Sequence, residues 1–445
     1  MWRTGVRVDP TPPAVPAEGS ARWLARLPLW PFLALSVLMI ATACWWWVWG
    51  DNLLERRALD RLRRTRHVEV LAIPAGWPFR LPGPASWVMA GMAWIVPPPV
   101  PSVKLRIAPE AGRAVFEELR FVRDVTALDA RGTAIVDEDL RHLRRGTGVQ
   151  ELLLDDTAIG DAGIEHLRGL RVWRMSLVGT RISDTALTVI GTIEPLEELD
   201  LRRTRIDGSG LVALAALKSL HRLNLGDTRV TDAGLRGLAG MRSLTWLELN
   251  RTPVTDAAIE TIVALPNVIS MSLDRTNVGD AGLALLPKER FLWDKLSLRH
   301  TRVTSAGLCR LPLEPSNLYL AGTKVDDTVL PWLLSNRCLT RLDLSSTGLT
   351  DDGLTRLREI STLRVLDVRG CPITDRGVFR LLLPPEKLPV ETESPEGRGA
   401  ARHALSAENS VDRLWLHPQD VRGTAVSAEV VDCIRRFVST VEIRR

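Results

Sequence analysis

Aspartate recurs at a fixed interval through most of this 445-residue sequence, and a row of carboxylates could bind metal ions or transfer protons. It occupies nine of eleven positions that follow one another by 22 to 25 residues, Asp232 and Asp256 among them. In most units the preceding residue is Thr, Ser or Asp, whose side chain can cap the first free amides of a helix. A carboxylate one position later lies at the positive end of the helix dipole. The row therefore predicts the starts of helices, and we expect no metal site or catalytic acid in it.

No other combination of side chains in the sequence is typical of an active site. The seven histidines form no HExxH motif, no glycine-rich phosphate loop precedes a predicted helix, and no G-x-S-x-G motif is present. The five cysteines contain no CxxC pair, which mildly favours a reducing compartment. We therefore expect a protein that is not an enzyme and that needs neither a cofactor nor a metal ion.

The aspartates belong to a longer repeat that is best followed through its threonines. Ten threonines and then one cysteine follow one another by 22 to 25 residues, at Thr133, Thr157, Thr180, Thr204, Thr228, Thr252, Thr276, Thr301, Thr323, Thr347 and Cys371. Five residues before each stands Leu or Met, and three before it Leu or Val in all but one unit. This period of two predicts a short strand with one face inward. Seven and ten residues after the threonine stand aliphatic residues, the i, i+3 spacing of a helix face.

One strand plus one helix is too small to close a hydrophobic core alone, so the units must stack into a solenoid. Strand and helix then bury their apolar faces against the same core. The threonine lies between inward-facing aliphatic residues, and we expect its buried hydroxyl to hydrogen-bond backbone amides of its own and neighbouring loops. Cys371 fits the same slot because its side chain is small and weakly polar.

The repeat is clearest at residues 220–238, which read LHRLNLGDTRVTDAGLRGL. The frame LxxLxLxxTxVTDAGLxxLxxL resembles the leucine-rich repeats of large families of membrane-anchored planctomycete proteins, which are similar in turn to the ribonuclease-inhibitor-like and bacterial GALA types. The resemblance covers residues 125–388, which make about eleven repeats. It implies an α/β solenoid with parallel strands on the concave side and helices on the convex side. Such families share a scaffold and a habit of binding, and not an activity.

Several segments depart from the frame. Gly208 and Ser305 replace the aspartate, and the Pro-rich stretch 311–315 shortens a helix and predicts less regular stacking there. Outside the repeats, composition and the need for atypical ends predict four further parts. They are a disordered Pro-rich tail at 1–26, a basic juxtamembrane stalk with the N-terminal cap at 51–124, a flexible insertion at 389–409, and a degenerate last repeat with the C-terminal cap at 410–445.

A membrane segment is predicted near the start of the chain. Residues 27–50 carry no charge and are long enough to cross a bilayer as a helix. Four tryptophans crowd its end, at positions 45, 46, 47 and 49, and indole rings prefer the headgroup level. The alternative is a cleaved signal peptide with an A-x-A site from Ala41 to Ala43. Cleavage there would leave the tryptophan run at a new N-terminus, so we expect an uncleaved, single-pass transmembrane helix.

The flanking arginines indicate the side of the membrane on which the repeats lie. Three arginines precede the segment within about 20 residues and six follow it, and positive flanks tend to stay cytoplasmic. We therefore expect cytoplasmic repeats. The periplasmic or envelope side is the alternative, because a large domain can follow its anchor outward.

Charge argues against nucleic acid as a partner. The net charge is +5, but residues 1–110 hold 13 Arg and Lys against 7 Asp and Glu, which leaves 45 against 46 for the rest of the chain. The excess of positive charge therefore lies beside the membrane segment, where basic residues attract anionic lipid. A neutral solenoid lacks the broad basic surface that is typical of a nucleic-acid-binding protein.

Candidate binding residues are the outward-facing positions of the strands. Trp, Tyr and Arg are the usual anchors of protein interfaces, and Trp246 is the one large exposed aromatic residue that we expect away from the ends. The alternative for Trp246 is a structural role, in which it covers neighbouring side chains. The predicted partner-binding residues on the concave face are Arg202, Arg222, Trp246, Glu248, Asp274, Arg299 and Tyr319. Just past three consecutive strands, Arg181, Arg205 and Arg229 predict either an anion-binding rim or a solvated one.

Together these features predict a membrane-anchored leucine-rich repeat scaffold that mediates protein–protein interaction without catalysis. A second hypothesis is an adaptor of a larger enzyme complex, with the ubiquitin-ligase-like role that GALA-type proteins have. A third is a cell-envelope module that binds polysaccharide. The predicted partners are an unidentified protein and, through residues 27–50, the membrane.

Overall fold

The computed structural model describes residue 39 and residues 54–65, 67–73, 102–111, 113–122, 125–143, 149–286, 293–311, 314–382 and 413–415. The chain divides into two compact units, one of Met1–Arg57 with Trp77–Pro99 and one of Ala58–Gly76 with Val100–Arg445. Almost all described residues belong to the second unit, which contains the solenoid.

Several predicted segments lie outside the described residues. They are the tail at 1–26, the insertion at 389–409 and, apart from Met39, the membrane segment at 27–50. In the part of the chain that the structure describes, no helix combines the length and the apolar composition needed to cross a bilayer.

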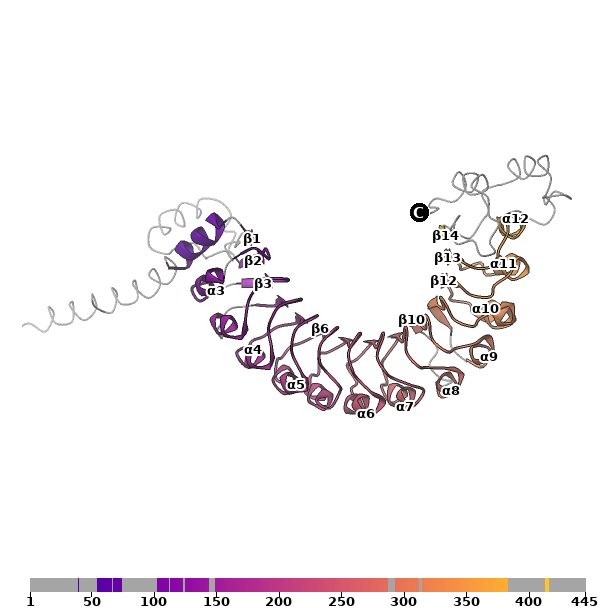
Figure 1. Ribbon diagram of the computed structural model, residues 1–445, viewed down its shortest axis with the longest axis horizontal. Coiled ribbons are helices and arrows are strands. Elements are labelled where there is room, and N and C mark those ends of the chain that lie inside the picture. The colour runs from indigo at the N-terminus through magenta and orange to yellow at the C-terminus, as the bar shows by residue number, and fades with distance from the viewer. Residues whose placement is uncertain are drawn as a thin grey trace, which may run out of the picture. The chain divides into compact units, whose positions relative to one another are not determined.

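Each repeat contributes one short strand to a single sheet, in which strands that are neighbours in sequence are also neighbours in space. Adjacent strands of the repeats are parallel and in register, so that Leu223 lies between Leu199 and Leu247. Figure 1 shows the strands along the inner side of the solenoid and the helices along its outer side. The repeat strands are β3 (Val125–Asp129), β4 (Glu151–Leu153), β5 (Arg174–Ser176), β6 (Glu198–Asp200), β7 (Arg222–Asn224), β8 (Trp246–Glu248), β9 (Ser270–Ser272), β10 (Trp293–Ser297), β11 (Pro315–Tyr319), β12 (Arg341–Asp343) and β13 (Val365–Asp367).

A short helix follows each strand and packs its aliphatic residues against the strand's inner face. Leu235 and Leu238, seven and ten residues after Thr228, are buried in this way, as the helical spacing predicts. The α-helices are α4 (Asp161–Glu165), α5 (Asp184–Ile190), α6 (Asp232–Leu235), α7 (Ala257–Val263), α8 (Asp280–Leu283), α9 (Ser305–Leu308), α10 (Leu330–Ser335), α11 (Asp351–Leu357) and α12 (Asp375–Leu382). The 3₁₀ helices are η2 (Asp137–His142), η3 (Leu211–Ala216), η4 (Arg236–Leu238) and η5 (Asp327–Val329).

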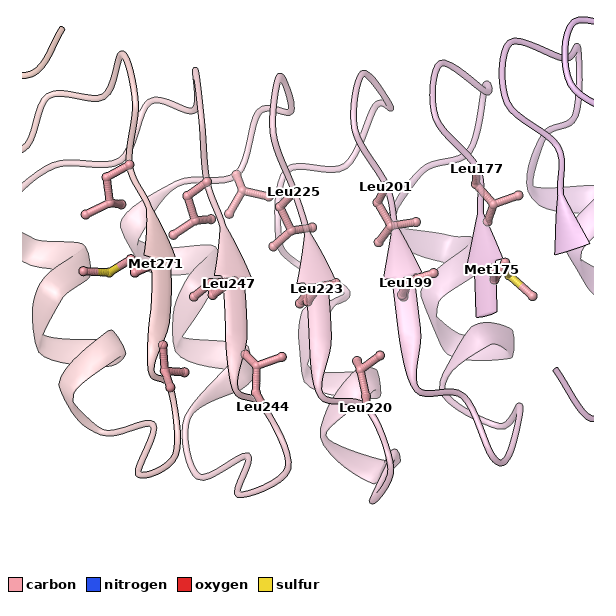
Figure 2. Packing of buried hydrophobic residues seen from close by; sticks show 14 of the residues in the cluster. Met175, Leu177, Leu199, Leu201, Leu220, Leu223, Leu225, Leu244, Leu247 and Met271 are labelled. Atoms are coloured by element: carbon pink, nitrogen blue, oxygen red, sulfur yellow. The ribbon is translucent and has the colours of Figure 1, made fainter. Parts of the chain in front are cut away.

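The core is a series of leucine rungs that stack from repeat to repeat. Figure 2 shows Leu223 and Leu225 of one repeat beside Leu199 and Leu201 of the preceding one, and all four are buried. Burying apolar surface stabilises the fold by roughly 25 cal/mol per Å². Because each rung is covered by the rungs on either side of it, no repeat closes the core alone.

The first repeat is covered by residues that lack the repeat pattern. Strand β1 (Val68–Ile73) pairs antiparallel with β2 (Ser102–Ile107), and β2 pairs parallel with β3. A helix at 54–64 and α3 (Ala114–Leu119) add buried apolar side chains to the same core, namely Ala58, Leu59, Leu62, Val115, Phe116 and Leu119. The helix at 54–64 thus belongs to the N-terminal cap as well as to the predicted stalk.

The Pro-rich stretch at 311–315 leaves the strand ladder in register. Leu318 of β11 lies between Leu296 and Leu342 of the neighbouring strands. Side chains of the next repeat hydrogen-bond the backbone carbonyls of the stretch. The Trp332 indole donates to Leu311 O at 2.9 Å, and the Asn336 amide donates to Pro315 O at 3.0 Å. These buried hydrogen bonds explain why the expected irregularity does not reach the sheet. At the far end, β14 (Arg413–Trp415) pairs parallel with β13.

The threonine row is buried as predicted, but its hydrogen-bond partners are carbonyls and not the predicted amides. In all ten repeats the hydroxyl donates to the carbonyl oxygen three residues earlier, at 2.6 to 2.7 Å. The hydroxyl thereby pairs a backbone oxygen at the point where the chain leaves the strand ladder. The Cys371 thiol instead donates to Leu344 O of the preceding repeat at 3.0 Å. Burial raises the pKa of this thiol above its usual range, so it stays protonated and inert.

Thr228→Val is expected to lower the free energy of unfolding by about 1–3 kcal/mol. The substitution keeps the shape of the side chain but removes the donor that bonds Leu225 O at 2.6 Å. Thr228→Ser keeps the hydroxyl and should be milder. Denaturant unfolding of the three proteins measures both effects, and an unchanged stability of Thr228→Val would show that this hydrogen bond contributes nothing.

The aspartate row joins each repeat to the next. The Asp280 carboxylate accepts hydrogen bonds from the backbone amide of Thr304 at 2.8 Å and from its hydroxyl at 2.6 Å. Ser183 and Thr231 also cap their own helices, as predicted, but most residues at this position are held by the preceding aspartate. The aspartates that bond the following repeat are Asp137, Asp161, Asp184, Asp232, Asp256, Asp280, Asp327 and Asp351.

The residue before each threonine turns the chain with a left-handed backbone. At Arg275, for example, φ is 58°, and its amide donates to Arg299 O of the next repeat at 2.7 Å. Non-glycine residues rarely adopt this conformation. We call these positions the corner residues: Gly132, Asp156, Gly179, Arg203, Asp227, Arg251, Arg275, His300, Gly322, Ser346 and Gly370.

Candidate functional site on the strand face

The outward side chains of the strands form the candidate binding surface, which we call the strand face. They stand six, four and two residues before each threonine, alternating with the buried leucines. Strands lie about 4.8 Å apart, so equivalent side chains of neighbouring repeats contact one another. All seven predicted partner-binding residues lie on this face, on or just after strands β6 to β11.

Trp246 is the centre of a cluster that joins β7, β8 and β10. The Arg222 guanidinium lies over the indole, 3.5 Å from a ring centroid, and the Lys295 ammonium lies 5.4 Å from it. The indole N–H donates to Glu248 Oε1 at 3.1 Å, and Glu248 also accepts from Asn224 at 2.8 Å and from Lys295 at 3.2 Å. Trp246 is therefore half-buried and held by cation–π and hydrogen-bond contacts, so it is less exposed than expected.

A ladder of alternating charges leads from β4 to this cluster. Arg174 lies between two carboxylates, 3.1 Å from Glu151 and 3.4 Å from Glu198, and Arg222 lies 3.4 Å from Glu198. Each charge is partly neutralised by its neighbours. In the described structure the Nε atom of Arg222 is buried without a hydrogen-bond partner, which is an energetic cost of placing the guanidinium over the indole.

Two further arginines of the predicted set are already paired. Arg202 donates from Nε and Nη2 to the Asp200 carboxylate at 3.0 and 2.8 Å, and this hydrogen bonding raises the pKa of the guanidinium. Arg299 lies 2.7 Å from Asp343 and places its guanidinium over the Tyr319 ring, 4.5 Å from the centroid. These contacts orient the arginines on the face before any partner arrives.

Two hollows on the strand face are bordered by the predicted partner-binding residues. The first has a volume of about 260 Å³ and is bordered by Arg202, Arg222, Trp246 and Glu248, four of the seven predicted residues. The second, of about 320 Å³, is bordered by Arg202, Glu248, Asp274 and Arg299 of the predicted set. The structure thus brings six of the seven residues to two neighbouring hollows, while Tyr319 lies beside Arg299.

The predicted rim lies past the corner residues, beside the strand face. Arg181, Arg205 and Arg229 are exposed, and the backbone amides of the last two bond the preceding repeats at Ile182 O and Ile206 O. The three arginines therefore form a file at the spacing of the repeats. Among the described residues none of their side chains has a hydrogen-bond or ion-pair partner, and none borders either hollow. Anion binding by this rim stays a prediction.

Arg205→Glu is expected to slow the association of an anionic partner several-fold and to leave its dissociation rate nearly unchanged. An exposed charge outside the hollows acts through long-range attraction, which governs encounter more than residence time. The effect should shrink as salt is raised, because the Debye length falls. Surface plasmon resonance at two salt concentrations measures both rates; a change confined to dissociation would place Arg205 in direct contact with the partner.

The sequence pattern did not predict the left-handed backbone of the corner residues. Arg251, Arg275 and His300 border the second hollow, and each has a left-handed backbone. A basic residue before the threonine in consecutive repeats was the available signal. Its meaning depends on a backbone conformation that Arg and His seldom adopt.

Nothing in the described part of the chain resembles a metal centre. No three His, Cys, Asp or Glu side chains there are arranged to hold an ion. The aspartates of the row are instead engaged by the amides of the following repeats, as in Asp232 with Thr255 at 2.8 Å.

The comparison with known families rests on the repeats themselves. A family model described as Leucine Rich repeat matches residues 194–215, 216–239, 335–357 and 360–382. The protein is built from leucine-rich repeats. Their strands form the parallel sheet described above, and scaffolds of this kind typically mediate protein–protein interaction. No curated protein matches this chain in sequence.

Several solved leucine-rich repeat structures are similar to this chain. An internalin (inlF) from Listeria monocytogenes is 17% identical, with a TM-score of 0.46, over 79% of this chain and 94% of that one. A leucine-rich repeat protein of Leptospira interrogans is 16% identical, with a TM-score of 0.43, over 74% and 80%. The ectodomain of the Arabidopsis thaliana receptor kinase GASSHO1/SCHENGEN3, solved in complex with CASPARIAN STRIP INTEGRITY FACTOR 2, is 15% identical, with a TM-score of 0.38, over 70% and 42%.

Proposed function

We propose that this leucine-rich repeat protein is a membrane-anchored, non-enzymatic scaffold that binds a protein partner on its strand face. The Trp246 cluster carries the proposal. It combines an aromatic ring, the Arg222 guanidinium and a hollow of about 260 Å³ at one place. Buried aromatic and arginine side chains at the centre of an interface contribute most of the binding energy in protein complexes.

The chemistry of the face favours a protein over a polysaccharide. A sugar ring binds by stacking on an open aromatic face, whereas the Trp246 indole is covered by Arg222 at 3.5 Å. The alternating ladder from Glu151 to Arg222 presents donors and acceptors in turn, which suits the mixed polar groups of a protein surface. An adaptor role in a larger enzyme complex would use the same surface, with an enzyme as the partner.

The membrane part of the proposal comes from the sequence. Residues 27–50 are uncharged and end in four tryptophans, as in a transmembrane helix with an interfacial belt. The arginine excess after the segment favours cytoplasmic repeats. Protease treatment of intact cells tests this orientation: cytoplasmic repeats resist digestion until the membrane is opened, and digestion in intact cells would place them on the envelope side.

Full-length protein is expected to stay in the membrane fraction after washing with alkaline carbonate. Deletion of residues 1–50 should release the repeats into the soluble fraction, because the described helices are too short or too polar to span a bilayer. Fractionation and immunoblotting compare the two chains. Recovery of a mature chain that begins near Cys44 would contradict the anchor and identify a cleaved signal peptide.

Capture from native membranes tests the binding face. Wild-type protein, Arg222→Ala on the strand face and His166→Ala on the outer side are used as baits, with quantitative mass spectrometry of the captured proteins. We expect the partner to be depleted by Arg222→Ala and retained by His166→Ala, whose exposed side chain lies at the end of α4. The reverse pattern would assign binding to the helices.

A further inference from the structure

The second hollow has an edge made of three successive corner residues. Arg251, Arg275 and His300 follow β8, β9 and β10 and border a volume of about 320 Å³. Because the amide of Arg251 donates to Asp274 O and that of Arg275 donates to Arg299 O, both at 2.7 Å, the three backbones stack at the spacing of the repeats.

The carboxylates around this hollow are already engaged. Glu248 accepts from Trp246, Asn224 and Lys295. Asp274 accepts hydrogen bonds from the Ser297 hydroxyl and the Arg299 backbone amide. Asp227 forms an ion pair with Arg251 at 3.4 Å.

The cations are not all matched. Arg202 pairs with Asp200 and Arg299 with Asp343, both outside the hollow, and Arg299 also lies 4.0 Å from Asp274 at its border. Among the described residues, the side chains of Arg275 and His300 have no hydrogen-bond or ion-pair partner. The hollow therefore has an uncompensated cation at its edge, and an anionic group from another molecule is the complementary ligand.

The fold itself does not require cations at these corners. Four other repeats place glycine there, at Gly132, Gly179, Gly322 and Gly370, and glycine adopts the left-handed conformation without steric cost. Arginine in that conformation is strained, and strained residues that persist are found mostly at functional sites. At Arg275, a side chain that costs backbone strain borders the second hollow.

We propose that the second hollow binds an acidic side chain of the partner, with the Arg275 guanidinium as the principal donor. The proposal rests on the function proposed above and names the chemistry of one contact. A single carboxylate matches the one unpaired arginine in bidentate geometry. A phosphate polymer fits less well, because three carboxylates already border the hollow and would repel its repeated charges.

Binding of two designed peptides to the full-length protein in detergent tests the proposal. The probes are fluorescein-labelled decapeptides of alternating Glu and Ser, or of alternating Gln and Ser, followed by fluorescence anisotropy at 50 mM NaCl. We expect the Glu peptide to bind and the Gln peptide not to bind. Arg275→Gly should raise its Kd at least fivefold while the melting temperature stays equal or rises, because glycine relieves the left-handed strain. A residue kept for structure would instead lower the melting temperature.

Two matched controls separate charge from backbone effects. Ser346→Gly makes the same backbone change at another corner with φ of 54°, and Arg242→Gln removes an exposed cation from the loop before β8. Both should leave the Kd within twofold of wild type. Equal binding of the Glu peptide by wild type and Arg275→Gly, or equal binding of the two peptides, would overturn the proposal.

A nucleic acid probe tests the choice of occupant. If a ten-residue thymidine oligonucleotide bound more tightly than the Glu peptide with the same dependence on Arg275, the acidic side chain would be the wrong ligand. The capture experiment with Arg222→Ala keeps this outcome separate from the proposed function. If partner capture depended on Arg222 but peptide binding did not depend on Arg275, the inference about the second hollow would be wrong and the proposed function would stand.

Discussion

Gly282→Ala is expected to lower the free energy of unfolding by about 1–3 kcal/mol, although alanine is the better helix former. A Cβ on Gly282 would lie 2.5 Å from the Oδ1 atom of Asp256 in the preceding repeat. The carboxylate cannot move away without losing its 2.6 Å hydrogen bond from the Gly279 amide. Chemical denaturation of the variant measures the loss.

Asp256→Ala provides the control for this clash. It removes the carboxylate that the new methyl group would meet, so Gly282→Ala should cost at least 1 kcal/mol less in that background, a non-additivity that a double-mutant cycle detects. Asp256→Ala alone is expected to be destabilising, since a charge-assisted hydrogen bond contributes about 1.5–3 kcal/mol. Strict additivity of the two substitutions would mean that the aspartate and glycine rows are independent features of the repeat.

Trp246→Ala is expected to weaken binding of the partner by about 2 kcal/mol, which is the usual cost of removing an interface anchor. The substitution also removes the ring under Arg222 and one donor to Glu248, so the first hollow loses its shape. The fold should survive because the side chain points outward from β8. Titration of the captured partner against wild type and variant gives the two dissociation constants.

Trp246→Phe separates packing from hydrogen bonding at the same position. It keeps an aromatic ring for Arg222 but lacks the N–H that bonds Glu248 at 3.1 Å, and an intermediate loss of affinity is expected. Affinity unaffected by either substitution would show that Trp246 only covers neighbouring side chains, the structural alternative that its sequence position leaves open.

Much of the fold could be predicted because the same buried positions recur in every repeat of the sequence. Buried positions such as Leu223, Leu235 and Thr228 follow from apolar spacing alone, since a strand has a period of two and a helix of 3.6. The contacts between repeats could not be read in this way. The bond from Asp280 to Thr304 depends on a distance between units, and no local pattern distinguishes it from a helix cap.

The candidate site was harder to predict for a related reason. Outward positions of short strands are set by the same alternation, so the seven residues of the strand face could be named. Their partners could not, because the pairing of Trp246 with Arg222 and Lys295 joins three different repeats. The left-handed backbone at Arg251, Arg275 and His300 could not be predicted from residue preferences either, because these favour glycine or asparagine in that conformation.

Site-specific photocrosslinking in native membranes tests the binding face most directly. A benzophenone amino acid is placed singly at Arg174 on β5, or at His166 or Arg236 on the outer side, all exposed positions of the full-length chain. After irradiation, a crosslinked partner is expected from position 174 and not from 166 or 236. A partner crosslinked only from the outer positions would contradict the account and make the stacked helices the binding surface.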